Sequence, residues 1–239
     1  MNFSAIRIVL VATSHPGNIG SSARALKTMG LERLYLVTPK SFPDYRAHEM
    51  AAGADDLLDK CVVVDTLSEA LKGCQLAIAT SARPRGLALP GLMPRACAEL
   101  VGNQSDDTEV AIVFGREHAG LTNEELLHCH YHVNIPSNPD YSSLNLAQAV
   151  QIIAYELRMQ QLSTPALVAS SQEILASTEE IEHFYNHLSE VLLAINFLKP
   201  KNPGRVAQRI RRLFNRVRLE RMEVSILRGI LSHMQKFLR

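Results

Sequence analysis

The sequence of 239 residues contains no tryptophan, and its aromatic content is only 5%. It also lacks a C-x-x-C pair, because its four cysteines are scattered along the chain as Cys61, Cys74, Cys97 and Cys129. This cysteine usage favours reduced thiols in a cytoplasmic protein. No apolar run approaches the roughly 18 residues that a membrane helix needs. The apolar stretch 6–12 contains Arg7 and no cleavage site follows it, so it predicts a strand and not a signal peptide.

The net charge of only +1 hides an uneven distribution of charge. Residues 199–239 carry 12 Lys and Arg against 2 Asp and Glu, whereas residues 1–198 carry 13 against 22. The chain is therefore an acidic body with a strongly basic tail. Such asymmetry favours a polyanionic partner, in particular a nucleic acid, over the alternative of a solvated basic helix surface.

Short β-branched segments alternate with helical segments through the first 159 residues. Several of these strands are almost entirely apolar, as IVLV and AIVF show, which is typical of a parallel sheet covered by helices on both faces. The predicted strands are Ile6–Val11, Leu34–Val37, Val62–Val64, Leu76–Thr80, Val110–Phe114 and His132–Ile135. The predicted helices are Ile19–Met29, Glu49–Leu58, Leu67–Leu71, Arg95–Val101, Asn123–Leu127 and Leu144–Met159. The fold class is therefore α/β.

The pattern changes after residue 160. The segment 161–178 is rich in Ser, Thr and Ala and is interpreted as a linker. Three apolar stripes with helical spacing follow, and the first two are separated by KPKNPG, which no helix continues through. We expect residues 1–160 to form one domain and residues 179–239 to form a small helical extension. Such an extension is too small to bury a large core, so it should pack against the body or a partner chain.

The second stripe of the extension, Val206 to Val217, has an arginine ladder beside it. The ladder consists of Arg205, Arg209, Arg212 and Arg216, spaced for one helix face. A membrane surface is a poor match for this face, because the helix has no tryptophan and no lipid anchor is apparent. Contact with RNA phosphates is the better interpretation.

Polar loops follow four of the predicted strands. The first strand leads into TSHPGNIGSSARALKTMG, residues 13–30, in which Asn18 lies in the turn and Arg24 lies within the helix. This strand–turn–helix arrangement suits an anion, but it matches neither G-x-G-x-x-G nor the P-loop pattern. TSARPR, GREHAGLTNEEL and PSNPDYSSLNLAQAV follow the strands that end at residues 80, 114 and 135. Ligands of open α/β sheets bind at this carboxyl edge. The alternative for Ser142 and Ser143 is that they only cap the following helix.

PGNIGSSARA, FGREHAGLTNEEL and NIPSNPDYSSLNLAQAVQI together resemble the three motifs of the SPOUT-class, TrmH-like RNA 2′-O-ribose methyltransferases. The resemblance covers residues 5–160 densely and the basic extension more thinly. With CHYHVNIPSNPDYSSLNLA, the first motif is most similar to a bacterial branch that modifies cytidine or uridine at position 32 of the tRNA anticodon loop. The chain departs from this branch at Ala12, where the branch has glutamate, so no carboxylate role is carried over to that position.

This resemblance implies a SPOUT-type parallel sheet with a C-terminal trefoil knot, an S-adenosylmethionine cofactor, a tRNA partner and a homodimer with its active site at the subunit interface. Sequence physics alone would not predict a knot. The implied cofactor positions are Thr80, Ser81, Ala82, Gly115, Ile135, Ser142, Ser143 and Leu144, with Ile135 and Leu144 flanking the adenine. The implied catalytic positions are Arg24, Asn18 and Ser142.

Arg24 matches the family's catalytic arginine. Because a guanidinium stays protonated, we expect Arg24 to position phosphate and stabilise the developing oxyanion, and whether it also takes the proton is left open. Asn18 would orient ribose or phosphate. Glu117 would fix an arginine or, alternatively, be a surface carboxylate.

HCHYH, residues 128–132, brings three histidines and a cysteine together and raises the question of zinc. His130 and His132 alternate along a predicted strand and no second ligand pair follows, so no metal is expected. The functional alternatives to a tRNA methyltransferase are a ribosomal RNA methyltransferase and a non-catalytic RNA-binding module on the same scaffold.

Overall fold

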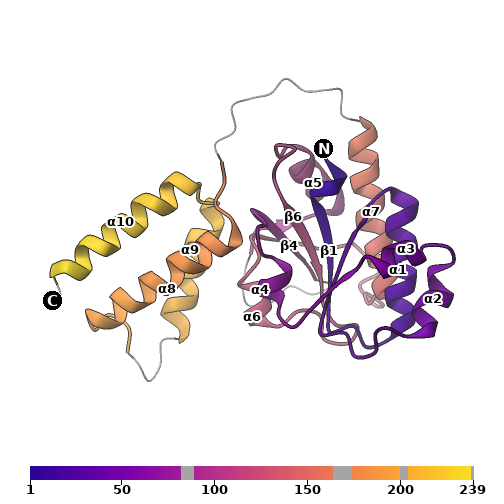
Figure 1. The fold of residues 1–239 in the computed structure, drawn as a ribbon, viewed down its shortest axis with the longest axis horizontal. Helices are drawn as coiled ribbons and strands as arrows, with labels where there is room; N and C mark the ends of the chain where they lie inside the picture. The colour runs from indigo at the N-terminus through magenta and orange to yellow at the C-terminus, as the bar shows by residue number, and fades with distance from the viewer. Residues whose placement is uncertain (82–88, 164–173, 200–203, 238–239) are drawn as a thin grey trace.

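The computed structural model describes residues 1–81, 89–163, 174–199 and 204–237. A seven-stranded sheet with strand order β3-β2-β1-β6-β4-β7-β5 forms the centre of the body, and all its pairings are parallel. Helices cover both of its faces, and a separate group of helices lies at one side (Figure 1). The predicted α/β class is confirmed.

The strands of the body are β1 (Ile6–Val11), β2 (Arg33–Val37), β3 (Val62–Val64), β4 (Leu76–Thr80), β5 (Gly91–Leu92), β6 (Val110–Phe114) and β7 (Tyr131–Val133). Its helices are α1 (Pro16–Met29), α2 (Tyr45–Ala51), α3 (Asp55–Asp59), α4 (Leu67–Ala70), α5 (Pro94–Gly102), α6 (Asn123–Leu126) and α7 (Leu146–Ser163), and a short 3-10 helix covers Phe3–Ala5. The extension contains α8 (Thr178–Ala194), α9 (Gly204–Val217) and α10 (Arg221–Phe237).

Strand β1 shows why the sheet has a core on each face. All six of its residues are buried. Because side chains alternate along a strand, Ile8 and Leu10 pack with α1 and α7, whereas Val9 and Val11 pack on the opposite face, toward α4 and α6. A strand with two buried faces has no polar alternation, which explains the run IVLV.

Two predictions about local structure were wrong. The predicted helix Glu49–Leu58 is two helices, α2 and α3, because Ala52 and Gly53 both have positive φ angles, of 45° and 93°. Such angles end a right-handed helix. The two-residue strand β5 was missed, because so short an edge strand leaves no periodic signal.

The extension packs against the body, as its size predicted. Its own core is small and contains eight buried residues. Thr178, the first residue of α8, donates from its backbone N and its Oγ1 to the carbonyl oxygen of Cys74, at 2.7 and 2.6 Å. Arg211 Nε and Asn215 Nδ2 of α9 donate to the carbonyl oxygen of Leu127, at 3.1 and 3.0 Å. These bonds fix the extension to the chain just before β4 and just before β7.

Helix α9 packs by a face that includes only part of the apolar stripe that its sequence indicated. Phe214 of this stripe packs against the core of the extension, edge to face with Phe184. Val206, Leu213 and Val217 of the predicted apolar stripe are exposed. Asn215 is buried beside the partly buried Arg211, which also contacts the body through Leu127. The reason is that the body offers free carbonyl oxygens at this point, which amide and guanidinium groups satisfy and apolar groups cannot.

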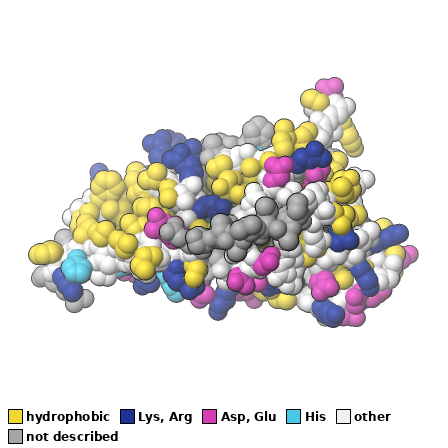
Figure 2. All heavy atoms as spheres, turned by 90° about the horizontal axis from the view of Figure 1, so that it is seen from above, with side chains coloured by type: hydrophobic (Ala, Val, Ile, Leu, Met, Phe, Trp, Pro, Cys, Tyr) yellow, Lys and Arg dark blue, Asp and Glu magenta, His cyan; other side chains and the backbone are white. Residues whose placement is uncertain are grey.

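Helix α10 also leaves apolar residues at the surface. Viewed from above, hydrophobic side chains gather over the extension (Figure 2). Among the described helices, none combines the length and the hydropathy that would let it cross a membrane.

Candidate active site

A cavity of about 330 Å³ lies at the carboxyl ends of β4, β6 and β7. It is the size of a small-molecule site. The loops after these three strands had been predicted to bind a ligand, and seven of the eight predicted cofactor positions line the cavity. They are Thr80, Ser81, Gly115, Ile135, Ser142, Ser143 and Leu144. The eighth, Ala82, lies outside the described residues.

Hydrogen bonds hold the loops around the cavity in place. Asn134 Nδ2 donates to the carbonyl oxygen of Ser81 at 3.0 Å, and Ser81 N donates to that of Val133 at 3.1 Å. These bonds join the loop after β4 to the loop after β7. Ser137 Oγ donates to the carbonyl oxygen of Ser142 at 3.0 Å, which braces the loop that carries Ser142 and Ser143. The cavity is thus shaped before any ligand enters.

Gly115 lies where two parts of the loop after β6 approach each other. Arg116 and Gly120 exchange backbone hydrogen bonds of 3.2 and 2.8 Å, and Arg116 also pairs with Glu125 at 2.9 Å. A Cβ atom on Gly115 would lie only 2.2 Å from the carbonyl carbon of Gly120. Only glycine fits such a backbone approach.

We therefore expect Gly115→Ala to weaken cofactor binding at least about tenfold and to lower the free energy of unfolding by about 3 kcal/mol. The two effects have one cause, since the loop that lines the cavity must move to admit the methyl group. Isothermal titration calorimetry and urea denaturation measure them. Ala119→Gly, in the same loop, is the control, and normal cofactor affinity in Gly115→Ala would show that the loop tolerates the shift.

Glu117 connects three of the predicted motifs. Its carboxylate accepts hydrogen bonds from Ser14 N and Ser14 Oγ, at 3.0 and 2.9 Å, from His15 N at 3.2 Å and from Asn18 Nδ2 at 2.9 Å. Asn18 Oδ1 in turn accepts from Asn145 Nδ2 at 2.9 Å. Glu117 therefore holds the start of α1, and among the described residues of this chain it forms no ion pair with an arginine.

Asn145 is a residue of this network that sequence reasoning did not single out. Its Oδ1 accepts from Ala147 N at 2.9 Å, so it caps α7 with one atom and holds Asn18 with the other. An asparagine directly before the long helix was a signal for the cap. The contact with Asn18 joins residues 127 positions apart, and no local pattern indicates it.

The pKa of Glu117 reports the strength of this network. Partial burial raises it, but the hydrogen bonds from Asn18 and Ser14 outweigh burial and lower the pKa from 4.5 to about 2. Because the folded pKa lies below the unfolded one, ionised Glu117 stabilises the fold above about pH 5. This contribution is lost as pH falls from about 5 toward 2.

We expect Glu117→Gln to lower the free energy of unfolding at pH 7 by about 1 kcal/mol, because a neutral amide accepts these bonds less strongly. The difference in the free energy of unfolding between the two proteins should shrink as the pH is lowered toward 3. The reason is that the stabilising contribution of the ionised Glu117 carboxylate in the wild type is progressively lost below about pH 5. Urea denaturation of both proteins between pH 7 and pH 3 tests this. A deficit that stays constant with pH would mean that the charge of Glu117 does not stabilise the fold.

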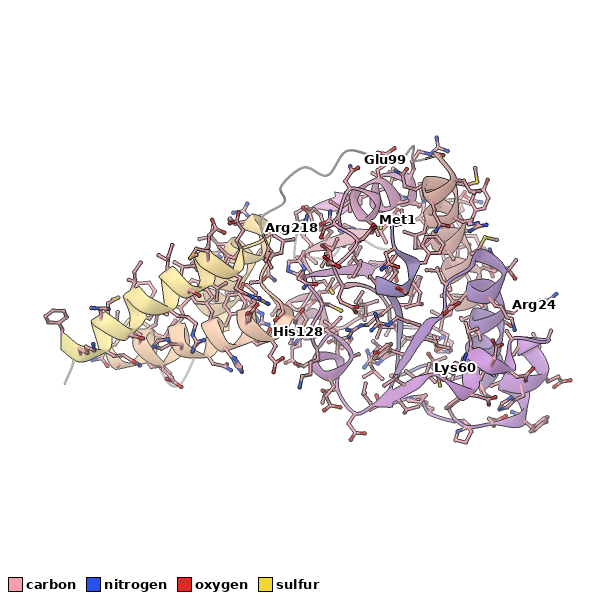
Figure 3. All side chains as sticks on the ribbon, turned by 45° about the horizontal axis from the view of Figure 1, so that its top comes forward. Met1, Arg24, Lys60, Glu99, His128 and Arg218 are labelled. Carbon is pink, nitrogen blue, oxygen red and sulfur yellow. The ribbon has the colours of Figure 1, made fainter. Side chains whose placement is uncertain are left out.

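Arg24 does not line the cavity. It is exposed on α1, on the side that faces away from the sheet (Figure 3). Asn18, at the start of the same helix, is held at the site through Glu117. The structure thus brings Asn18 and Ser142 to one region of a single chain, but it leaves Arg24 facing outward.

The predicted RNA-binding arginines share the outer face of α9. Arg205, Arg209 and Arg216 are exposed and Arg212 is partly exposed. Within the described ranges none of the four forms an ion pair. Arg211 and Arg218, by contrast, belong to the contact with the body, where His128 and Arg218 lie (Figure 3). The four ladder arginines therefore remain available to a polyanion.

The histidines of HCHYH are engaged elsewhere. The buried His130 accepts a hydrogen bond from Ala77 N through Nδ1 at 3.0 Å. Burial and nearby Arg218 lower its pKa to about 4, so it stays neutral at pH 7. His128 lies 3.4 Å from Glu182 of α8. No group of three metal-ligating side chains is assembled among the residues that the structure describes.

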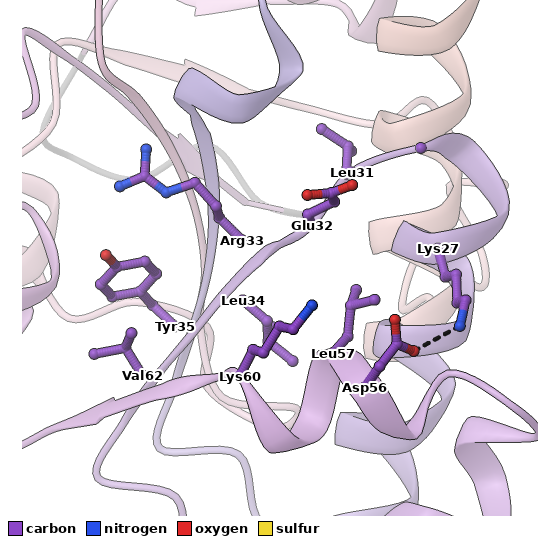
Figure 4. A pocket seen from close by; sticks show the side chains of 11 residues that line it. Lys27, Leu31, Glu32, Arg33, Leu34, Tyr35, Asp56, Leu57, Lys60 and Val62 are labelled. Atoms are coloured by element: carbon purple, nitrogen blue, oxygen red, sulfur yellow. Dashed lines mark hydrogen bonds and ion pairs between the residues drawn. The ribbon is translucent and has the colours of Figure 1, made fainter.

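A second cavity, of about 400 Å³, lies between β2, α1 and α3 (Figure 4). No predicted site residue lines it. Lys27 bonds to Asp56 at 2.6 Å across one side, as the dashed line in Figure 4 shows. Arg33 bonds to Glu109 at 2.6 Å. Because these charges neutralise one another, we assign it no ligand.

Comparisons with known proteins match both parts of the chain. Residues 5–155 match the model of the SpoU rRNA Methylase family, and residues 179–239 match the C-terminal domain of the tRNA methyltransferase TrmJ. The chain is 53% identical over 235 residues to the tRNA (cytidine/uridine-2′-O-)-methyltransferase TrmJ of Pectobacterium atrosepticum, covering 97% of each protein. It is 50% identical over 240 residues to the TrmJ of Photorhabdus laumondii, covering 97% of each.

Solved structures share this architecture. TrmJ from Z. mobilis ZM4 superposes with a TM-score of 0.85 at 33% identity, covering 96% of this chain and 98% of that one. A probable methylase family protein from Haemophilus influenzae has a TM-score of 0.66 at 47% identity, covering 99% and 98%. The SpoU methyltransferase AviRb of Streptomyces viridochromogenes, in complex with AdoMet, shares the fold at 24% identity, with a TM-score of 0.51 over 66% of this chain.

Proposed function

Because the chain belongs to the SpoU rRNA methylase family and its extension to the TrmJ C-terminal domain family, we propose that it methylates the ribose 2′-oxygen of cytidine or uridine in tRNA. The observation that carries this proposal is the cavity at the carboxyl edge of the sheet. Three loops that are far apart in the sequence converge there, and seven positions expected to bind the cofactor line it. The relatives' names supply the nucleoside and the substrate.

The cavity suits S-adenosylmethionine. Ile135 and Leu144 provide apolar walls for an adenine, while Thr80, Ser81 and Ser142 provide polar groups at the rim. The close approach at Gly115 leaves the loop backbone at the wall of the cavity, where it could bind the cofactor. Bound there, S-adenosylmethionine would supply an electrophilic methyl group on sulfonium.

The chain's own residues must then activate the ribose hydroxyl, which is a poor nucleophile until its proton leaves or its developing charge is stabilised. In our proposal Arg24 binds the neighbouring phosphate and stabilises the oxyanion. Asn18, held by Glu117 and Asn145, orients the ribose. Ser142 lines the cavity, and in this proposal it would lie near the methyl group that is transferred.

We further propose a homodimer in which Arg24 serves the cavity of the other subunit. Two observations support it. Arg24 faces outward on α1, and α7, which packs beside α1, exposes Tyr155, Met159 and Leu162. These three are spaced at i, i+4 and i+7, so they form one apolar stripe. A second subunit packed on this stripe would bury it and approach Arg24.

The substrate position that we propose is nucleotide 32 of the anticodon loop, by resemblance of the first and third motifs to the branch that modifies it. The arginine ladder of α9 would hold the tRNA body. We propose a cytoplasmic location, where tRNA is processed and where Cys61, Cys74, Cys97 and Cys129, all free thiols, stay reduced.

The test is methyl transfer from labelled S-adenosylmethionine to unmodified tRNA transcripts, followed by mapping of the methylated riboses. Label at position 32 is the expected result. Label on ribosomal RNA alone would support the methyltransferase activity but contradict tRNA as its substrate. Cofactor binding without transfer to either RNA would favour the non-catalytic RNA-binding module.

A further inference from the structure

His118 lies at the tip of the loop that follows β6, and it lines the candidate cofactor cavity. Its side chain is exposed, and within the described ranges it forms no hydrogen bond or ion pair. The loop is closed at its base, because Arg116 and Gly120 exchange backbone hydrogen bonds of 3.2 and 2.8 Å. A fixed loop therefore presents a free imidazole at the cavity.

The two residues before His118 are held by other elements. Arg116 binds both carboxylate oxygens of Glu125 in α6, at 2.9 Å each. Glu117 accepts a hydrogen bond of 2.9 Å from Asn18 Nδ2 at the start of α1. Asn18 is the group that would orient the ribose, so His118 is adjacent in the chain to the carboxylate that holds this group.

The proposed reaction leaves a proton for the chain to remove. The ribose 2′-oxygen forms a bond to the methyl carbon while the bond from carbon to sulfur breaks, and the sulfur keeps that electron pair as a neutral thioether. The O–H bond of the ribose also breaks, and its proton must pass to a base. The roles given above to Arg24 and Asn18 do not include this transfer.

Arg116, Glu117 and His118 are the ionisable residues among the described residues that line the cavity. Arg116 is no base, because a guanidinium stays protonated and the hydrogen bonds to Glu125 raise its pKa further. Glu117 is a weak base, because hydrogen bonds from Asn18 and Ser14 outweigh partial burial and lower its pKa to about 2. An imidazole suits proton transfer near neutral pH.

We propose that His118 is the general base that takes the proton of the ribose 2′-hydroxyl. A neutral imidazole accepts a hydrogen bond from the hydroxyl through one ring nitrogen and then receives the proton there. The positive charge of a sulfonium in the cavity favours this neutral form over imidazolium. Because the side chain is exposed, the proton can pass on to solvent. This inference rests on the proposed function, in which Arg24 stabilises the charge that develops on the oxygen.

The loop after β6 also contacts charged groups on α6 and at the start of α1. Arg116 and Glu125 are paired, and Glu117 is ionised at neutral pH, so none of them titrates there. His15 is a second imidazole close to this loop, since its backbone N donates to Glu117 at 3.2 Å. Its Nδ1 caps α1 by accepting from Gly17 N at 3.2 Å. His15→Asn keeps a capping side chain and removes this imidazole, so it is the matched control.

The first test is the pH dependence of single-turnover methyl transfer to tRNA. In wild type and in His15→Asn, the rate should rise about tenfold per pH unit up to a break between about pH 6 and pH 7.5, and then level off. His118→Gln should be at least about a hundredfold slower on the plateau and should lack the break. A plateau rate in His118→Gln within about twofold of wild type would overturn the proposal.

Chemical rescue separates a base from a residue that only shapes the loop. His118→Ala leaves space for a free base, so millimolar imidazole should raise its rate at least about tenfold. Arg24→Ala, which lacks a different group, should not respond to imidazole. Absence of rescue in His118→Ala, or equal stimulation of both variants, would contradict proton transfer to His118.

A binding measurement reports the same contact without methyl transfer. A tRNA with 2′-deoxyribose at the nucleotide that mapping identifies lacks the hydroxyl that His118 contacts. With S-adenosylhomocysteine present, this change should weaken binding to wild type about tenfold and to His118→Ala only about twofold. Equal losses in the two proteins would show that His118 does not touch the hydroxyl.

Calorimetric titration excludes the alternative that His118 holds the cofactor. The dissociation constant for S-adenosylmethionine should stay within about twofold of wild type in His118→Gln. A much weaker affinity, with a normal rate at saturating cofactor, would assign His118 to cofactor binding and overturn its role as the base. If wild type transfers no methyl group to tRNA, the proposed function and this inference both fall. If wild type and His118→Gln methylate tRNA equally fast, only this inference falls.

Discussion

Replacing Arg24 with alanine should lower kcat for tRNA methylation at least about a hundredfold, as expected for the loss of a group that stabilises developing negative charge. The dissociation constant for S-adenosylmethionine should stay unchanged within about twofold, since Arg24 does not line the cavity that would bind it. Single-turnover methyl transfer and calorimetric titration separate the two effects. Normal turnover in Arg24→Ala would remove Arg24 from the mechanism.

The outward position of Arg24 makes a sharper experiment available. If Arg24 serves the cavity of the other subunit, mixing inactive Arg24→Ala with an inactive cavity variant creates heterodimers with one complete site. Random reassociation of equal amounts should then restore about one quarter of wild-type activity. If Arg24 serves its own cavity, no mixed dimer contains a complete site and no activity returns.

Gly115→Ala, tested first for loss of cofactor binding, is the partner variant for this mixture. Each variant alone, taken through the same dissociation and reassociation, is the control, because reassociation by itself must not restore activity. If methyl-transfer activity returns only when Arg24→Ala is mixed with Gly115→Ala, the result supports both the dimer and the role of Arg24. Absence of recovery, when labelled subunits are shown to exchange, would contradict the shared site.

Much of the body was predictable because its signals are local. A run such as IVLV is apolar throughout, and β1 covers Ile6–Val11, as predicted. The carboxyl edge of a parallel sheet is a known position for ligands, so the polar loops after residues 80, 114 and 135 could be assigned to one site. The cavity that they line agrees with this assignment.

The parts that were missed depend on contacts between distant segments. Glu117 was expected to meet an arginine or solvent, but it holds Ser14 and Asn18, about 100 residues earlier. The apolar stripe of α9 predicted its packing only in part, because Phe214 joins the core of the extension while Arg211 and Asn215 donate to the carbonyl oxygen of Leu127. Periodicity reports only that a face is apolar, and not which surface is nearby. The trefoil knot, which only the family resemblance implies, stays a prediction.

The arginine ladder provides the second large effect. Replacing Arg205, Arg209, Arg212 and Arg216 together with glutamine should weaken tRNA binding by about a thousandfold at moderate salt. The slope of log K against log salt should fall by about 3 in magnitude, because each phosphate contact contributes roughly 0.7–0.9 to it. The side chains are outside the contact with the body, so the extension should stay docked and the affinity for S-adenosylmethionine should not change.

Filter binding across a salt series measures this slope. The pair Arg205→Gln/Arg209→Gln should reduce it by about half as much as the quadruple variant, since the contacts are separate. Arg228→Gln/Lys236→Gln on α10 removes the same charge from another helix and serves as the matched control. If the control pair reduces the slope equally, total charge and not the α9 face recruits the RNA. If neither pair changes it, the tRNA is held by the body alone, and the basic extension must act through its contacts with protein.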